Sequence, residues 1–181
     1  MSAMPLIGFI QLPVPESSFY YSAGNTPLAA GFLTSILISA LEYPRDRIKI
    51  IPRELANNGN DQSIIEWILK ENINIIGFTH YLWNIERQLF IAEKIKKIQP
   101  KTIIIAGGPE VHPNHPFLSE KNTDIIVQGE GEKIICSILE DILKKKELNP
   151  VYKNQAPFIL DEIPNPYLEN ILQAEKNESI L

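Results

Sequence analysis

Short apolar runs recur along the chain, and most of their residues are isoleucine. They occupy residues 6–10, 48–51, 75–78, 102–106 and 124–127. Each run is nearly continuous rather than alternating, which is typical of strands that are buried on both faces of a parallel sheet. We therefore predict five parallel strands at the centre of the protein.

Stretches with helical periodicity lie between these runs. We predict helices over residues 27–41, 61–70, 84–98 and 131–146. Thr26 is a favourable cap for the first helix, with Pro27 at its first position, and Asp61 is a favourable cap for the second. Strands that alternate with a helical connection in each gap give right-handed crossovers and an open sheet. The predicted fold is α/β and flavodoxin-like (Rossmann-like), a three-layer, doubly wound, five-stranded parallel sheet of order 2-1-3-4-5.

The alternation stops near Leu148, and prolines become frequent after it. They stand at positions 150, 157, 164 and 166. Such a segment is typical of an extended tail or linker rather than of another layer. We predict one α/β domain over residues 1–147, followed by a proline-rich tail over residues 148–181.

Composition narrows the class of protein. The length of 181 residues suits a single domain with a substantial core. A net charge of −5 argues against a nucleic-acid partner, because phosphate binding needs a basic surface. No apolar run is long enough to cross a membrane. The lone Cys136 excludes an internal disulfide and is expected to be a small core residue. We expect a soluble, cytoplasmic protein.

Four loops follow the predicted strands and form the candidate site, because ligands of doubly wound sheets bind beyond the carboxyl ends of the strands. They cover residues 11–25, 79–84, 107–116 and 129–132. The first is long for its type. Its aromatic residues Phe19, Tyr20 and Tyr21 suit two interpretations equally: a cover for a large ligand or another domain, or a loop folded on its own side chains.

The loop after the third strand carries a hydroxyl, an imidazole and two aromatic rings. Together they form a platform suited to a flat ligand. The residues are Thr79, His80, Tyr81, Leu82 and Trp83. His80 is a candidate ligand or acid–base group, but we favour a histidine with its hydrogen bonds satisfied.

Paired glycines, Gly107 and Gly108, follow the fourth strand. Because glycine has no Cβ, they suit either the close approach of a ligand to the backbone or a tight turn into the next element. His112 and His115 lie further along this loop and resemble a metal-binding pair. The prolines beside them and the lack of a helix make that geometry unfavourable, so we favour surface histidines.

The loop after the fifth strand is Gly129-Glu130-Gly131-Glu132. Its glycines expose backbone N–H groups at a helix N-terminus, which suits polar ligand groups. The two carboxylates oppose a bare phosphate, so hydroxyls and amides are the expected ligand groups. Capping of the following helix by Glu130 and Glu132 is the structural alternative, and both interpretations are compatible.

Several enzyme classes are disfavoured. A phospho-acceptor receiver domain needs an aspartate where this chain has Phe78-Thr79-His80. Neither a P-loop nor a G-x-G-x-x-G motif follows the first strand, and there is no G-x-S-x-G elbow. The motifs alone indicate a binding domain. A self-sufficient flavodoxin-like enzyme would have to use His80 and Glu110, and it would need a catalytic pair within reach.

Five segments also support a resemblance. They are GNTPLAAGFL at 24–33, IGFTHYLWN at 76–84, AGGPEV at 106–111, GEGE at 129–132 and DEIPNPY at 161–167. The first four resemble the amino-terminal cobalamin-binding domain of cobalamin-dependent radical S-adenosylmethionine enzymes. The fifth is similar to the linker that leads into the radical domain of that family.

The resemblance implies a corrin ring that lies over the carboxyl ends of the strands. It implies that the 79–83 loop and the glycine pair border the corrin and its nucleotide tail, and that residues 129–132 help to line the tail pocket. The cofactor-binding residues expected from it are Thr79, His80, Tyr81, Leu82, Trp83, Gly107, Gly108, Pro109, Glu110, Gly129, Glu130 and Gly131.

Two departures from the family limit what this chain is expected to do. The D-x-H-x-x-G motif of the wider cobalamin-binding fold is absent from residues 11–16, so base-off binding without that histidine is expected, and only His80 offers a substitute. The C-x-x-x-C-x-x-C motif that holds a 4Fe-4S cluster is also absent.

We therefore expect the chain to be non-catalytic on its own, as a fragment of a methyltransferase or cyclase or as a stand-alone binder. A radical domain that carries the 4Fe-4S cluster and S-adenosylmethionine, in the same chain or another, would be its partner. The alternative is a protein-interaction domain of the same fold that has lost the cofactor.

Overall fold

The computed structural model describes residues 4–14, 26–112, 118, 122–154 and 163–173. Within them, all strands join one parallel sheet of order β2-β1-β3-β4-β5-β6. The strands are β1 (Ile7–Ile10), β2 (Ile48–Ile50), β3 (Ile75–Thr79), β4 (Ile103–Gly107), β5 (Ile125–Gln128) and β6 (Val151–Lys153). The first five match the predicted strands to within a residue at each end, and the predicted fold class is confirmed.

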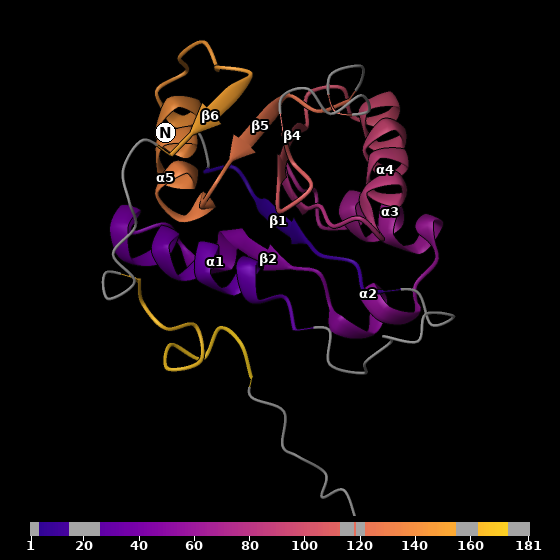
Figure 1. Cartoon of the computed structure of the whole chain (residues 1–181), viewed down its shortest axis with the longest axis horizontal. Coiled ribbons are helices and arrows are strands. Elements are labelled where there is room, and N and C mark those ends of the chain that lie inside the picture. The colour runs from indigo at the N-terminus through magenta and orange to yellow at the C-terminus, as the bar shows by residue number, and fades with distance from the viewer. Residues whose placement is uncertain (1–3, 15–25, 113–117, 119–121, 155–162, 174–181) are drawn as a thin grey trace, which may run out of the picture.

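Helices cover both faces of this sheet (Figure 1). They are α1 (Leu28–Leu41), α2 (Arg53–Asn58), α3 (Asp61–Lys70), α4 (Ile85–Ile98) and α5 (Gly131–Leu143), with a 3₁₀ turn at Arg45–Arg47. Helices α1 and α5 pack together on one face, and α3 packs against α4 on the other. No helix in the described ranges is both long and apolar enough to span a membrane.

Strand residues alternate between two hydrophobic cores because successive side chains point to opposite faces of a sheet. Ile7 and Phe9 of β1 belong to the core under α1 and α5. Ile10 and Ile76 belong to the core under α3 and α4. Both cores are buried, which explains why the strands read as continuous apolar runs in the sequence.

Both predicted helix caps are wrong by one residue. Helix α1 begins at Leu28, and its cap residue is Pro27, which makes no side-chain capping bond. Asn60, not Asp61, caps α3, and its Oδ1 accepts a hydrogen bond from the Ser63 N–H at 2.9 Å. Asp61 stands inside the first turn, where a carboxylate is also favourable.

Besides the 3₁₀ turn, two elements are missing from the prediction, α2 and β6. Strand β6 pairs with β5 in parallel, so the sheet extends past the predicted boundary at Glu147. Its three residues are partly exposed at the sheet edge, and such a short strand leaves no clear period in the sequence. We expected a helical connection in each gap between strands, but no helix lies in the described part of the β4–β5 connection, residues 108–112, 118 and 122–124.

Residues 163–173 form a compact turn packed on α1, not an extended tail. The turn is the yellow segment below α1 in Figure 1. Its buried Leu172 fits against Gly31 so closely that a Cβ on Gly31 would lie 2.4 Å from the leucine side chain. The Arg45 guanidinium donates to the carbonyl oxygens of Glu169 and Asn170. This docking helps to explain why α1 carries no charged residue.

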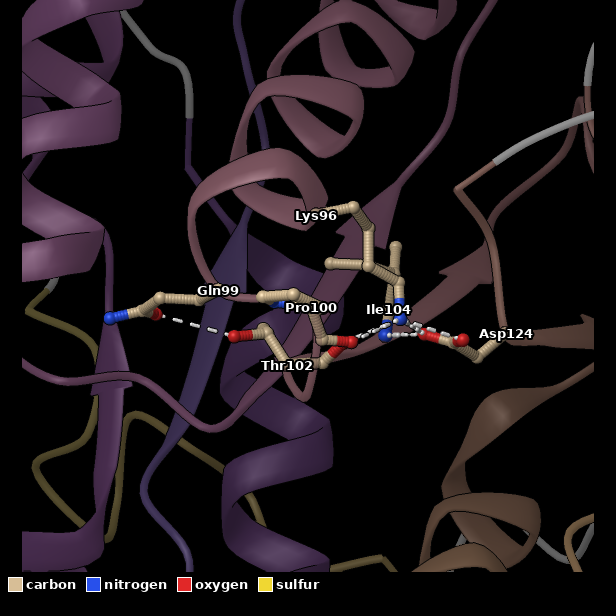
Figure 2. A network of polar contacts seen from close by, with 6 residues as sticks. All are labelled: Lys96, Gln99, Pro100, Thr102, Ile104 and Asp124. Atoms are coloured by element: carbon tan, nitrogen blue, oxygen red, sulfur yellow. Dashed lines mark hydrogen bonds and ion pairs between the residues drawn. The ribbon is translucent and has the colours of Figure 1, made fainter.

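A polar network joins α4, β4 and β5 at the amino-terminal edge of the sheet (Figure 2). Lys96 Nζ lies 2.6 Å from Asp124 Oδ2 and donates to the Thr102 carbonyl oxygen at 2.8 Å. The same carboxylate oxygen accepts from the Ile104 N–H at 2.7 Å. The side chain of Lys96 is only 19% exposed, so this pair is better shielded from water than a surface ion pair.

We predict that Lys96→Met lowers the free energy of unfolding by about 1–2 kcal/mol, because it breaks a shielded charged hydrogen-bond network. Lys97→Met is the matched control on the same helix, since the Lys97–Glu93 pair is more exposed, and it should cost under about 0.5 kcal/mol. Urea denaturation of both variants measures the difference. Equal losses would contradict the structural importance of the Lys96–Asp124 pair.

Candidate functional site

A cavity of about 480 Å³ opens at the carboxyl end of the sheet, on the α1 and α5 face. Phe9, Gly77, Ile105 and Val127 from four adjacent strands line its sheet side. Gly77 has no side chain, and the Phe9 ring lies over it, 2.7 Å from where a Cβ would stand. The helical walls are equally apolar: Ala29 and Leu33 come from α1, and Ile135 comes from α5.

Three of the four predicted loops meet at the mouth of this cavity. The predicted site residues that line it are Thr79, Tyr81, Gly107, Gly108, Pro109, Gly129, Glu130 and Gly131. Four others are not among the lining residues: His80, Leu82, Trp83 and Glu110. In the first loop, residues 15–25, including the three aromatics, lie outside the described residues.

The two adjacent glycines of the β4 loop have different functions. Gly108 has φ +113°, and a Cβ there would lie 2.5 Å from the His80 carbonyl oxygen. This glycine therefore serves the tight packing of one loop on another. A Cβ on Gly107 would meet protein atoms no closer than 3.9 Å, so the Gly107 position opens toward the cavity.

The loop after β3 separates its side chains between interior and surface. His80 is fully buried and its ring stacks on Phe78, with centroids 5.8 Å apart. Tyr81 and Trp83 stack almost in parallel, with centroids 4.6 Å apart and an interplanar angle of 5°. Leu82 is 77% exposed and Trp83 is 45% exposed. The aromatic platform is therefore a stacked pair at the rim.

The carboxylates of the site lie at the entrance to α5. Glu130 is the residue before the helix and makes no side-chain capping bond, so the capping interpretation is wrong for this residue. Glu132 stands in the first turn, where its charge complements the helix dipole. Because the other lining residues are uncharged, these two carboxylates are the charges that a ligand would meet there.

Cys136 and the described loop histidines, His80 and His112, do not line the cavity. Cys136 is partly buried on α5, and burial followed by the nearby Glu140 raises the pKa of its thiol to about 11. The thiol is therefore protonated at neutral pH. His112 is exposed, and its predicted neighbour His115 lies outside the described residues. The described residues contain no group of three or more metal-binding side chains close enough to hold an ion.

Sequence reasoning missed the floor and the helical walls of the cavity. Phe9, Gly77, Leu33 and Ile135 look like ordinary core residues in the sequence. The strand register brings the first two together, and the packing of α1 against α5 adds the other two. The glycine in the middle of β3 was an available signal, since a strand glycine often marks a close approach.

A comparison with known families gives a match over residues 36–139 to the B12-binding domain family. The chain belongs to this family. The matched segment includes all three described loops at the cavity mouth.

Two relatives of known activity match a shorter segment. One is the 2-(S-pantetheinyl)-carbapenam-3-carboxylate methyltransferase of Streptantibioticus cattleyicolor, 33% identical over 69 residues. Another is the cobalamin-dependent radical SAM methyltransferase TokK of Streptomyces tokunonensis, 33% identical over 68 residues. In each case the match covers 36% of this chain and 10% of the relative. The chain thus corresponds to a small part of these methyltransferases.

We predict that Gly108→Ala lowers the free energy of unfolding by about 2–3 kcal/mol, because the new Cβ would meet the backbone of His80 at a positive φ. The adjacent Gly107→Ala is the matched control, and its Cβ has room, so the change should stay within about 0.5 kcal/mol. Chemical denaturation of both variants checks the difference. A tolerated Gly108→Ala would contradict the close backbone packing described above.

Proposed function

We propose that this chain binds cobalamin, with the corrin over the carboxyl edge of β3, β4 and β5 and the nucleotide tail in the cavity. The observation that carries the proposal is the position of the cavity. It is an apolar pocket that opens between three loops of a B12-binding domain.

The lining residues of the cavity support this placement of the tail by their chemistry. Its sheet side is apolar, as a flat aromatic base requires, and Gly107 leaves the pocket next to Val127 open. Glu130 and Glu132 at the mouth accept hydrogen bonds, so they suit ribose hydroxyls and corrin amides better than the phosphate of the tail. The stacked pair of Tyr81 and Trp83 provides an aromatic rim for the corrin.

Bound cobalamin supplies a cobalt centre that can carry a methyl group. The residues of this chain would hold the cofactor and keep water away from its tail. The names of the two relatives support the further proposal that the chain is the cobalamin-holding part of a radical SAM methyltransferase. Its single cysteine is too few for the cluster motif, so the 4Fe-4S cluster and S-adenosylmethionine would belong to a partner domain.

The first test is retention of hydroxocobalamin by the purified chain after desalting, read from the corrin absorbance. We expect retention of the cofactor. Cobinamide, which lacks the nucleotide tail, should bind at least about tenfold more weakly because it leaves the apolar cavity unfilled. Gly107→Leu should reduce cobalamin binding by filling the pocket, with Gly107→Ala as the control for the substitution. No retained corrin would refute the function, whereas equal binding of cobinamide would refute only the placement of the tail.

A second test concerns the lower face of the cobalt. The first loop carries no histidine, and His80 is fully buried behind the cavity wall. We predict a bound-corrin spectrum typical of base-off cobalamin, with no change in that spectrum in His80→Ala. Absorbance spectra of both proteins with methylcobalamin provide the comparison, after circular dichroism has shown that the variant is folded. A spectrum typical of a lost nitrogen ligand would contradict base-off binding without a protein histidine.

The second candidate function is a protein-interaction domain that keeps the fold without the cofactor. The observation in its favour is the exposure of Leu82 and Trp83 on one loop at the site. Association with a partner protein in solution, together with no corrin binding, would favour this function.

A further inference from the structure

Side-chain amides, rather than strand pairing alone, hold the chain where it leaves β1. The Phe9 carbonyl oxygen still accepts from the Ile51 N–H next to β2, at 3.0 Å. Beyond it, the Ile10 carbonyl oxygen accepts from Gln88 Nε2 at 3.3 Å, and the Leu12 carbonyl oxygen accepts from Asn84 Nδ2 at 2.9 Å. Helix α4 and its cap residue therefore hold the exit of β1.

Asn84 also holds the loop that carries the aromatic rim. Its Nδ2 donates to the Thr79 carbonyl oxygen at 3.3 Å, and its Oδ1 accepts from the Tyr81 N–H at 2.8 Å. Both of these partners line the cavity. With Asn84 only 2% exposed, one buried amide group connects the exit of β1 to two residues of the β3 exit.

Gln88, one helical turn after Asn84, is not explained by stability. It is fully buried, its one donated bond is long, and its Oε1 has no hydrogen-bond partner among the described residues. A buried unpaired acceptor is costly, so an apolar side chain of similar size would serve the core about as well. The amide at this position therefore fits a positional purpose, which is to fix the carbonyl group of Ile10.

We propose that Asn84, supported by Gln88, is a positioning clamp that fixes the exit of β1 against the Thr79–Tyr81 segment and so sets the geometry of the ligand rim. The expected effect of the clamp on the affinity for cobalamin rests on the proposed cobalamin-binding function. Its consequence for the rim itself holds without any ligand, because every bond of the clamp lies within the chain.

Asn84→Asp is the decisive variant. The aspartate keeps the size of the side chain and the acceptor for the Tyr81 N–H. It loses both donors and faces the carbonyl oxygens of Leu12 and Thr79 with a negative charge. Protonation of the carboxyl group restores one donor, so the defect should diminish as the pH is lowered toward about 5, where a buried carboxyl group begins to take up a proton.

Two readouts are needed, and Trp83 provides the first. In a Trp67→Phe background Trp83 is the sole tryptophan, so its fluorescence reports the rim in the free chain. We expect greater acrylamide quenching in Asn84→Asp at pH 7 and partial recovery at lower pH. The second readout is the Kd for hydroxocobalamin, which should rise about tenfold in Asn84→Asp and about threefold in Gln88→Met.

Tyr43→Phe is the control for a general loss of stability. It removes the partly buried hydrogen bond from the Tyr43 hydroxyl to the Pro5 carbonyl oxygen, which precedes β1 at the opposite edge of the sheet. It should lower the thermal midpoint without altering Trp83 quenching or the Kd. Matching shifts in Tyr43→Phe and Asn84→Asp would overturn the clamp.

The remaining outcomes separate the clamp from the proposed function. Unchanged quenching in a folded Asn84→Asp chain refutes the clamp even if cobalamin binds. A wild-type chain that retains no corrin refutes the function, whereas the pH-dependent quenching still tests the clamp. If Asn84→Asp does not fold, Gln88→Met decides: a folded Gln88→Met chain with wild-type quenching and Kd refutes the clamp.

Discussion

The register of β3 against β1 and β4 is the constraint on which the site depends. It sets Gly77 opposite Phe9 and Ile105, and Thr79 opposite Gly107. A slip of one residue would turn every side chain of β3 to the other face and would put the Phe78 ring where the cavity needs a glycine. The isoleucines at the start of each strand hold this register because both faces are buried there.

The two edges of the sheet differ in chemistry. At the amino-terminal edge, the charged side chains of Lys96 and Asp124 connect α4 to the starts of β4 and β5. At the carboxyl-terminal edge, glycines and uncharged amides bring the backbone segments together and leave an apolar hollow. This separation keeps the Lys96–Asp124 pair away from the edge that carries the cavity.

The fold could be predicted from the sequence because its strands and main helices have strong, distinct periods. Elements with few residues or little burial were missed, namely α2 and β6. The candidate site could be predicted only as a set of loops. No periodic pattern in the sequence determines which side chain of a loop points inward. The sequence therefore could not show that His80 is buried whereas Tyr81 lines the cavity. The bond from Asn84 to Leu12 joins residues 72 positions apart and depends on where α4 packs.

Helix α1 contacts both the cavity and the 163–173 turn, which are built from distant parts of the sequence. Ala29 and Leu33 form part of the cavity wall, and Gly31 holds the 163–173 turn within van der Waals contact. If filling of the cavity displaces α1, the turn must shift or detach. Binding in the cavity and release of the turn would then be linked by a single coupling free energy. By thermodynamic reciprocity, the ligand would then change the equilibrium for release of the turn by a certain factor. Release of the turn would change the affinity for the ligand by the same factor. The single glycine of this uncharged helix contacts the docked turn, while Ala29 and Leu33 of the same helix line the pocket.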